Sequence, residues 1–222
     1  MNTLVISDTH FTKKFQQKRF EKLKTLIGKV DQVIINGDFW EGMSITFDEF
    51  MNSKWKKLFP ILKSKNTIYV YGNHDDKRLS DNRVFEFCNQ VTENYELETP
   101  KRNYFFTHGQ NFLYPRKTDR DESVKKSCKP STRFDIATAN ILQRTIFGLL
   151  GPNILPKSFN NIDQQTREKI TSIDNLLVCG HSHTPQYKPE INFMDIGFFN
   201  YGWANYLLID NQGEFEFKSE RY

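Results

Sequence analysis

Apolar and polar residues alternate along the first 75 residues in a way that predicts a repeated order of strands and helices. Short β-branched or aromatic runs at residues 4–6, 33–35 and 67–71 are typical of buried strands. Between them, apolar residues recur at helical spacing over residues 20–30 and 47–62. Strands that alternate with helices at intervals of roughly thirty residues predict an α/β fold with parallel strands.

The later part of the chain changes to a pattern of closely spaced strands. After a helix expected near residues 83–90, strand-like runs lie at residues 104–107 and 176–179. The remaining runs predict a meander that closes the sheet, and they lie at residues 192–196, 206–210 and 214–218.

Residues 112–170 interrupt this β region as a helical insertion within one domain of residues 1–222. A basic loop is expected first, then an apolar helix near residues 134–150 and a polar helix near residues 161–171. The segment carries eleven Lys or Arg and six Asp or Glu, although the whole chain has a net charge of only +4. We interpret it as a cap over the functional site; the alternative is an ordinary pair of helices packed on the sheet.

Short polar motifs follow the predicted strands, and together they contain all five histidines of the chain. In chain order they read Asp8-Thr9-His10, Gly37-Asp38, Gly72-Asn73-His74-Asp75, His108-Gly109 and Gly180-His181-Ser182-His183. The carboxyl ends of the strands of an open α/β sheet are where ligands gather. Because Asp, Asn and His without Cys suit divalent Mn, Fe or Zn, these motifs predict a metal centre.

A centre with two metal ions needs a carboxylate that bridges them, and Asp38, alone after its strand, is the expected bridge. Side chains alternate along an extended chain, so His181 and His183 are expected on one face, each serving one ion. Asn73 offers an amide oxygen at another strand end. Taken singly, each motif is also compatible with a turn or a chance occurrence, and the metal centre rests on their combination.

Asp8-x-His10, Gly37-Asp38-x-x-Glu41, Gly72-Asn73-His74-Asp75, His108-Gly109 and Gly180-His181-x-His183 resemble, in order, the five sequence blocks of the calcineurin-like metallophosphoesterases. The resemblance implies a four-layer α-β-β-α sandwich with a dinuclear site at one edge of the sheets. It implies a first metal held by Asp8, His10, Asp38 and His183, and a second held by Asp38, Asn73, His108 and His181. His74 takes the place of a catalytic histidine that is not a ligand, and Glu41 that of its acidic partner.

The resemblance also implies a hydrolase that acts through a metal-bridging hydroxide, without a phosphoenzyme. Two divalent cations lower the pKa of a shared water and neutralise phosphoryl oxygens, and His74 is suited to protonate the leaving oxygen. Mn is the expected metal, with Fe or Zn as alternatives. The expected substrate is small, with a phosphodiester or pyrophosphate bond in a nucleotide- or lipid-linked compound.

The insertion makes the chain similar to the UDP-diacylglucosamine pyrophosphatases, in which such a segment forms a lipid-binding lid. That similarity implies substrate binding by Arg116, Arg120 and Arg133, and peripheral membrane contact through the cap. However, those enzymes have Arg in the third block, where this chain has His74. A nucleotide phosphodiesterase, a protein phosphatase, a nuclease with a nucleic-acid partner and a non-catalytic binding scaffold stay open as alternatives. We expect the insertion to set substrate choice and not the hydrolytic step.

Three separated cysteines predict no disulfide framework and a reducing compartment. The N-terminal residues lack the pattern of a signal peptide, and no apolar run reaches the roughly 18 residues of a membrane span. We therefore expect a cytoplasmic protein.

Overall fold

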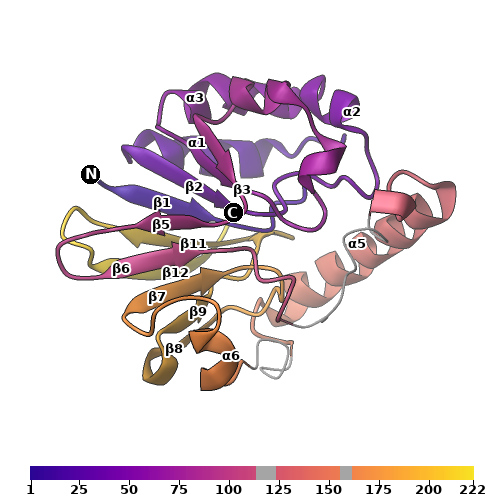
Figure 1. The fold of residues 1–222 in the computed structure, drawn as a ribbon. Coiled ribbons are helices and arrows are strands. Elements are labelled where there is room, and N and C mark those ends of the chain that lie inside the picture. The colour runs from indigo at the N-terminus through magenta and orange to yellow at the C-terminus, as the bar shows by residue number, and fades with distance from the viewer. Residues whose placement is uncertain (114–123, 156–161) are drawn as a thin grey trace.

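The computed structural model describes residues 1–113, 124–155 and 162–222 and has a mixed α/β fold built on two sheets (Figure 1). The first sheet has seven strands in these residues, ordered β10-β11-β1-β2-β3-β4, with β12 paired to β11. They are β1 (Thr3–Ile6), β2 (Gln32–Asn36), β3 (Ile68–Val70), β4 (Gln90–Thr92), β10 (Phe199–Asn200), β11 (Trp203–Ile209) and β12 (Phe215–Arg221). Strands β1 to β3 run parallel, as the sequence predicted, and β4, which the sequence did not predict, runs parallel to β3.

The second sheet has five strands in the described residues, ordered β5-β6-β7-β9-β8. They are β5 (Tyr95–Leu97), β6 (Asn103–Phe106), β7 (Asn175–Cys179), β8 (Gln186–Lys188) and β9 (Phe193–Asp195). The expected meander is therefore wrong. The run at residues 192–196 joins this second sheet, whereas the runs at residues 206–210 and 214–218 join the first.

Alternation of side chains along the strands separates two layers of core. On β1, Leu4 and Ile6 pack with the helices that cover the first sheet, whereas Val5 packs toward the second sheet. Ile34 of β2 joins Val5, and Tyr104 of β6 meets them from the opposite sheet. Both faces of the central strands are buried, which explains their nearly continuous apolar sequences.

The helices of the first layer are shorter than the sequence pattern predicted. The span 47–62 forms α2 (Phe47–Met51), the 3₁₀ helix η1 (Lys54–Leu58) and α3 (Phe59–Lys63), and α1 (Gln17–Gly28) lies beside them. The break has a local cause, because the Ser53 hydroxyl accepts a hydrogen bond from the Trp55 N–H at 3.3 Å and starts a new helix. The helix expected near residues 83–90 is the 3₁₀ helix η3 (Asn82–Glu86), which leads into β4. Two further 3₁₀ helices are η2 (Lys77–Leu79) and η5 (Pro189–Ile191).

The insertion divides into two parts that pack differently. The long helix α5 (Pro130–Leu150) crosses one end of the molecule, while α6 (Gln164–Glu168) lies against the second sheet (Figure 1). Phe147 is the one buried residue of α5 and packs on Phe198 and Tyr201. Among the described residues, no helix is long and apolar enough to cross a membrane.

Candidate metal centre

Five of the predicted metal ligands have a backbone conformation that residues other than glycine rarely adopt. Their φ angles are 52° at Asp8, 45° at His10, 52° at Asp38, 67° at His181 and 56° at His183. In the described part of the chain nine non-glycine residues have positive φ, so these ligands are most of them. Such strain persists only where the surrounding structure holds it, and it gathers at functional sites.

Asp8, His10 and His183 bring three ligand atoms to one point. The two Nε2 atoms of His10 and His183 lie 3.2 Å apart. Asp8 Oδ1 lies 3.1 Å from His183 Nε2 and 3.6 Å from His10 Nε2. Two imidazole nitrogens and a carboxylate oxygen that face one another are a suitable set for a divalent cation.

Asp38 lies between this group and His108. Its Oδ2 is 3.2 Å from His108 Nε2 and 3.6 Å from His10 Nε2. Its Oδ1 accepts a hydrogen bond from the His74 N–H at 2.8 Å. Ligand atoms of Asp8, Asp38 and His108 also lie within 4.8 Å of one another. One carboxylate oxygen that approaches both histidines is what a bridging ligand requires.

His181 and His183 point to different partners. His181 Nδ1 lies 2.9 Å from Asn73 Oδ1, whereas His183 lies with Asp8 and His10. The argument from alternation along an extended chain is wrong, because both residues have left-handed backbone. The turn nevertheless directs one imidazole to each side of the cluster.

Several buried ligand atoms have no hydrogen-bond partner. They are Asp8 Oδ1, His108 Nε2 and His181 Nε2, and the approach of His183 to Asp8 lacks hydrogen-bond geometry. A buried polar atom without a partner destabilises a protein by about 1–3 kcal/mol, so such atoms are rare. All three are nitrogen or oxygen atoms that a divalent metal binds, so the residues present fit a metal centre.

Glu41 holds two imidazole rings at once. Its Oε1 lies 2.6 Å from His74 Nδ1, and its Oε2 lies 2.9 Å from His10 Nδ1. A carboxylate on one ring nitrogen orients the other nitrogen toward a metal or a substrate. The contact with His10 was missed by the sequence reasoning, which gave Glu41 a role beside His74 only.

These contacts set the charges of the cluster. Burial opposes ionisation of Glu41, but His74 and His10 lower its pKa to about 2. Burial likewise favours neutral His74, yet Glu41 and Asp38 raise its pKa above the usual range. A histidine that holds its proton beside a carboxylate is suited to act as a general acid.

His108 and His181 differ in protonation, although both are buried. Burial favours neutral His108, but Asp38 and Asp8 outweigh it and raise the pKa of His108 to about 10. Burial and the neighbouring His108 lower the pKa of His181 to about 3. The His108 Nδ1 contacts the carbonyl oxygen of Asn36 at 3.0 Å, which directs its Nε2 toward Asp38.

Asp75 fixes the loops that carry Asp38 and Asn73. Its carboxylate accepts hydrogen bonds from the N–H groups of Gly72 at 2.7 Å, Phe39 at 2.6 Å and Asp38 at 3.2 Å. A Cβ atom at Gly72 would overlap the Asp38 carboxylate, so this position requires glycine. The sequence analysis gives Asp75 no role. Its place in a tight turn could have indicated one, because an acid there commonly binds backbone N–H groups.

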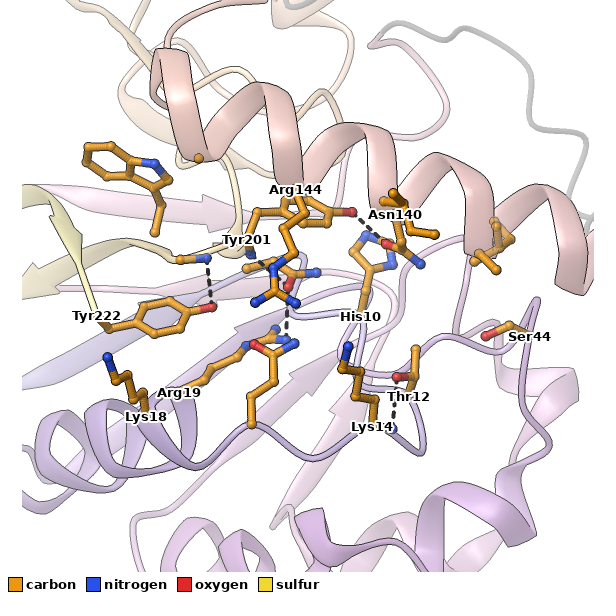
Figure 2. Close-up of a pocket in the computed structure, with 18 of the residues that line it drawn as sticks. His10, Thr12, Lys14, Lys18, Arg19, Ser44, Asn140, Arg144, Tyr201 and Tyr222 are labelled. Carbon is orange, nitrogen blue, oxygen red and sulfur yellow. Dashed lines mark hydrogen bonds between the residues drawn. The ribbon is translucent and has the colours of Figure 1, made fainter.

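A cavity of about 800 Å³ lies between the cluster and α5 (Figure 2). His10 reaches it from the cluster, and Tyr201 reaches it from the turn after β10. Of the predicted substrate-binding residues, Arg133 lines this cavity. Arg116 and Arg120 lie outside the described residues.

The α5 helix is attached to both sides of the site. Near its start, the Cys128 N–H donates to the carbonyl oxygen of Met43 at 2.9 Å, two residues after Glu41. Near its end, the Trp203 indole N–H donates to the carbonyl oxygen of Phe147 at 2.9 Å. Phe147 lies in the segment expected to form a lipid-binding lid, but it is buried beneath the helix.

Residues 1–185 match the model of the calcineurin-like phosphoesterases, and the chain belongs to that family. It is therefore a metallophosphoesterase, a hydrolase of phosphoester bonds that depends on divalent metal. The match includes every predicted ligand and both predicted catalytic residues.

Solved structures with a similar fold share little sequence with this chain. Yfce, a phosphoesterase from E. coli, has 16% identity and a TM-score of 0.48, covering 95% of this chain and 89% of its own. Vps29 complexed with Zn²⁺ from Entamoeba histolytica has 16% identity and a TM-score of 0.47, covering 100% of this chain and 98% of its own. Vacuolar Protein Sorting 29 from Cryptosporidium parvum has 14% identity and a TM-score of 0.45, covering 100% and 97%. No curated protein matches the chain.

Proposed function

We propose that this metallophosphoesterase holds two divalent metal ions and hydrolyses a phosphodiester or pyrophosphate bond of a small nucleotide- or lipid-linked substrate. The observation that carries the proposal is the set of buried ligand atoms without hydrogen-bond partners, Asp8 Oδ1, His108 Nε2 and His181 Nε2. These atoms lie on both sides of Asp38, whose Oδ2 approaches His10 and His108. Two ions, one on each side of Asp38, would give every atom of this set a partner.

The proposed ligands follow the two groups. Asp8, His10, Asp38 and His183 would hold one ion, and Asp38, Asn73, His108 and His181 the other. When bound, the ions would supply an activated water and neutralise phosphoryl oxygens. Mn is the proposed metal, because carboxylate, amide and imidazole ligands without thiolate suit it, and Fe and Zn suit similar sets.

The residues of the chain supply the proton and the orientation. Glu41 holds the His74 ring through Nδ1, so the Nε2 of His74 is the atom available to give a proton to the leaving oxygen. Asn73, directly before it, contacts His181, so the two adjacent side chains serve different purposes. His74 is therefore proposed as the general acid and Glu41 as the residue that orients it.

The cavity supports a small anionic substrate. Its volume of about 800 Å³ lies in the range of small-molecule sites, roughly 300–1,000 Å³, and Arg133 contributes positive charge. A substrate small enough to enter this cavity beside the ligand cluster is favoured over a folded protein or a nucleic-acid duplex. The nuclease and protein phosphatase alternatives lack a comparable supporting observation.

A peripheral contact with lipid is a further part of the proposal, together with a cytoplasmic location. The helix α5 exposes Leu149, Phe134 and Ile141, at 77%, 69% and 69% of their surface, and large apolar side chains are uncommon on a solvated helix. Sedimentation with anionic phospholipid vesicles tests this contact. Replacement of Phe134, Ile141 and Leu149 by Ser should abolish it, and equal sedimentation of the variant would contradict it.

Metal counting tests the dinuclear proposal. Asp38→Asn should lower occupancy at both positions, whereas His10→Ala should chiefly empty one, because Asp38 Oδ2 approaches both His10 and His108. Elemental analysis and anomalous scattering on the loaded protein measure both. Wild-type protein that saturates at one ion would contradict the dinuclear site, and stable metal binding without hydrolysis of any phosphoester would favour the binding scaffold.

A further inference from the structure

The floor of the cavity contains a buried positive charge without a carboxylate partner. Arg19 of α1 lines the cavity, yet only 1% of its surface is exposed. Its guanidinium donates to the carbonyl oxygen of Thr9 and, at 3.1 Å, to Asn200 Oδ1. Its Nε has no hydrogen-bond partner, and among the described residues no Asp or Glu forms a salt bridge with it.

Neutral partners do not compensate this charge. The contacts with Thr9 and Asn200 satisfy donors, and the Phe11 ring lies 4.7 Å from the guanidinium carbon in a cation–π contact. None of these groups carries a negative charge. Burial of an ionised group away from water is strongly unfavourable unless an opposite charge accompanies it. The floor of the cavity is therefore suited to an anion.

A second arginine, Arg144 of α5, lines the same cavity from the opposite side. Figure 2 shows the Arg144 side chain extending from α5 toward α1, the helix that contributes Arg19. Among the described residues Arg144 forms no salt bridge and no side-chain hydrogen bond. Two arginines that lack acidic partners and line one space repel each other until an anion lies between them.

The other charged side chains in the described lining are also positive. Among the residues that the structure describes, the cations of the lining are Lys14, Lys18, Arg19, Arg133, Arg144 and Arg221, and the lining contains no Asp or Glu. A cavity lined by this many cations attracts a polyanion and repels cationic ligands. Planar guanidinium groups also bind phosphate oxygens in pairs, which a carboxylate-lined pocket cannot do.

The arginine floor lies close to the metal ligands. Thr9, whose carbonyl oxygen Arg19 contacts, stands between Asp8 and His10 in the chain, and the His10 side chain also lines the cavity. An anion at Arg19 and a phosphoryl group at the metal centre would therefore belong to one compact molecule.

We propose that Arg19 and Arg144 form an anionic subsite that binds a second phosphate of the substrate while the scissile phosphate lies at the metal centre. This subsite rests on the proposed function for its catalytic neighbour and names the substrate class: compounds with two phosphate groups, one beside the other, and not single phosphodiesters. Arg144 determines specificity, because no described residue forms a salt bridge or hydrogen bond with its side chain, and Arg19 forms the buried floor.

The test uses metal-loaded full-length protein and measures dissociation constants by titration calorimetry. The probes are inorganic phosphate and three diphosphonates with methylene, ethylene and propylene linkers, which bracket the spacing between two phosphates. Wild-type protein should bind at least one diphosphonate about tenfold or more tightly than phosphate, as expected for an added charge-assisted hydrogen bond. Arg144→Gln should remove that advantage and change phosphate binding less than about twofold.

A matched variant controls for net charge. Lys129→Gln removes the same charge at the start of α5, outside the cavity lining, and should leave the diphosphonate affinity unchanged. Equal losses in Arg144→Gln and Lys129→Gln, or equal losses for phosphate and diphosphonate, would overturn the subsite. Arg19→Lys keeps a buried charge and tests the floor, with folding checked by circular dichroism.

The two proposals fail in different ways. Diphosphonate binding that depends on Arg144 in a protein that hydrolyses no phosphoester would sink the proposed function and keep the anion subsite. If the protein hydrolyses phosphoesters with two metals but Arg144→Gln leaves the diphosphonate affinity unchanged, the subsite is contradicted and the proposed function stands.

Discussion

The two walls of the cavity differ in how their side chains are held. On the wall of strand ends, the predicted ligands are buried except for the half-buried His183, and Glu41 holds the rings of His10 and His74. On the wall of α5, Phe147 is the one buried residue of the helix, and Arg144 forms no salt bridge or side-chain hydrogen bond with any residue that the structure describes. Under the proposed function, the residues of the chemical step would be held by one another, whereas Arg144 on the α5 wall would be held by the substrate.

The largest effect is expected for a change at His74, on the wall of strand ends. His74→Asn should retain metal and lose about 10²–10⁴-fold in turnover of an alkyl phosphoester, because the leaving oxygen then lacks its proton donor. The loss should be much smaller for a nitrophenyl ester, whose leaving oxygen needs no proton. Paired rates on metal-replete protein measure the difference. Equal losses would show that His74 positions the phosphoryl group instead, and loss of metal would make it a ligand.

A smaller effect is expected at Glu41, whose carboxylate contacts the rings of both His10 and His74. Glu41→Gln should weaken metal binding by about 10–100-fold, as removal of a residue that orients a ligand does. It should also lower turnover in a manner that is not additive with His74→Asn, because both changes act on one hydrogen bond. Glu96→Gln, on the exposed side of β5, is the matched control. Additive effects, or unchanged metal affinity, would show that Glu41 does not orient these histidines.

The protonation of His108 predicts a pH dependence of metal binding. In the metal-free protein, Asp38 and Asp8 raise the pKa of His108 to about 10 against the effect of burial, so the ring is charged at neutral pH. Metal binding must displace that proton, so affinity should rise as pH increases, about tenfold per pH unit for each proton released. His181, whose pKa burial lowers to about 3, is already neutral and adds nothing. Mn²⁺ titrations at several pH values between about 6 and 8 measure the slope, and a flat affinity would contradict this assignment.

The smallest effect is expected on the α5 wall at Arg133. This residue is exposed and lies 3.7 Å from Glu49, so Arg133→Gln should raise KM for an anionic natural substrate by about fivefold or less. Turnover of a small artificial diester should stay the same. Equal changes in both activities, with metal content intact, would place the insertion in the catalytic machinery and remove the contrast between the walls.

The sequence predicted the α/β class from the alternation of strands and helices. It predicted the approach of the site residues from their motifs at the ends of the strands. Parallel strands place Asp8, Asp38 and Asn73 at one edge, and this arrangement needs only the strand pattern and the motifs. The sheet partition was not predictable in the same way. Strands β9 and β11 have similar apolar patterns, and the turn chemistry between them does not say which sheet each joins.

The helices over residues 47–63 and the recognition residues were harder to predict from the sequence, for physical reasons. The three short helices over residues 47–63 share one apolar face, so their periodicity resembles that of a single helix, and the cap at Ser53 separates the first helix from the second. Arg19 lies on an amphipathic helix among lysines, and nothing local distinguishes it from a solvated residue. Its burial depends on Thr9 and Asn200, which are distant from each other in the chain.

The left-handed backbone at Asp8, His10, Asp38, His181 and His183 has a consequence for laboratory evolution. Each such residue typically destabilises the fold by about 1–3 kcal/mol, and glycine at the same place would relieve that strain. A library selected for heat resistance in the absence of metal would therefore accumulate glycine at these positions. The most heat-resistant descendants would be those that had lost their ligands, so resistance and hydrolysis have to be selected together.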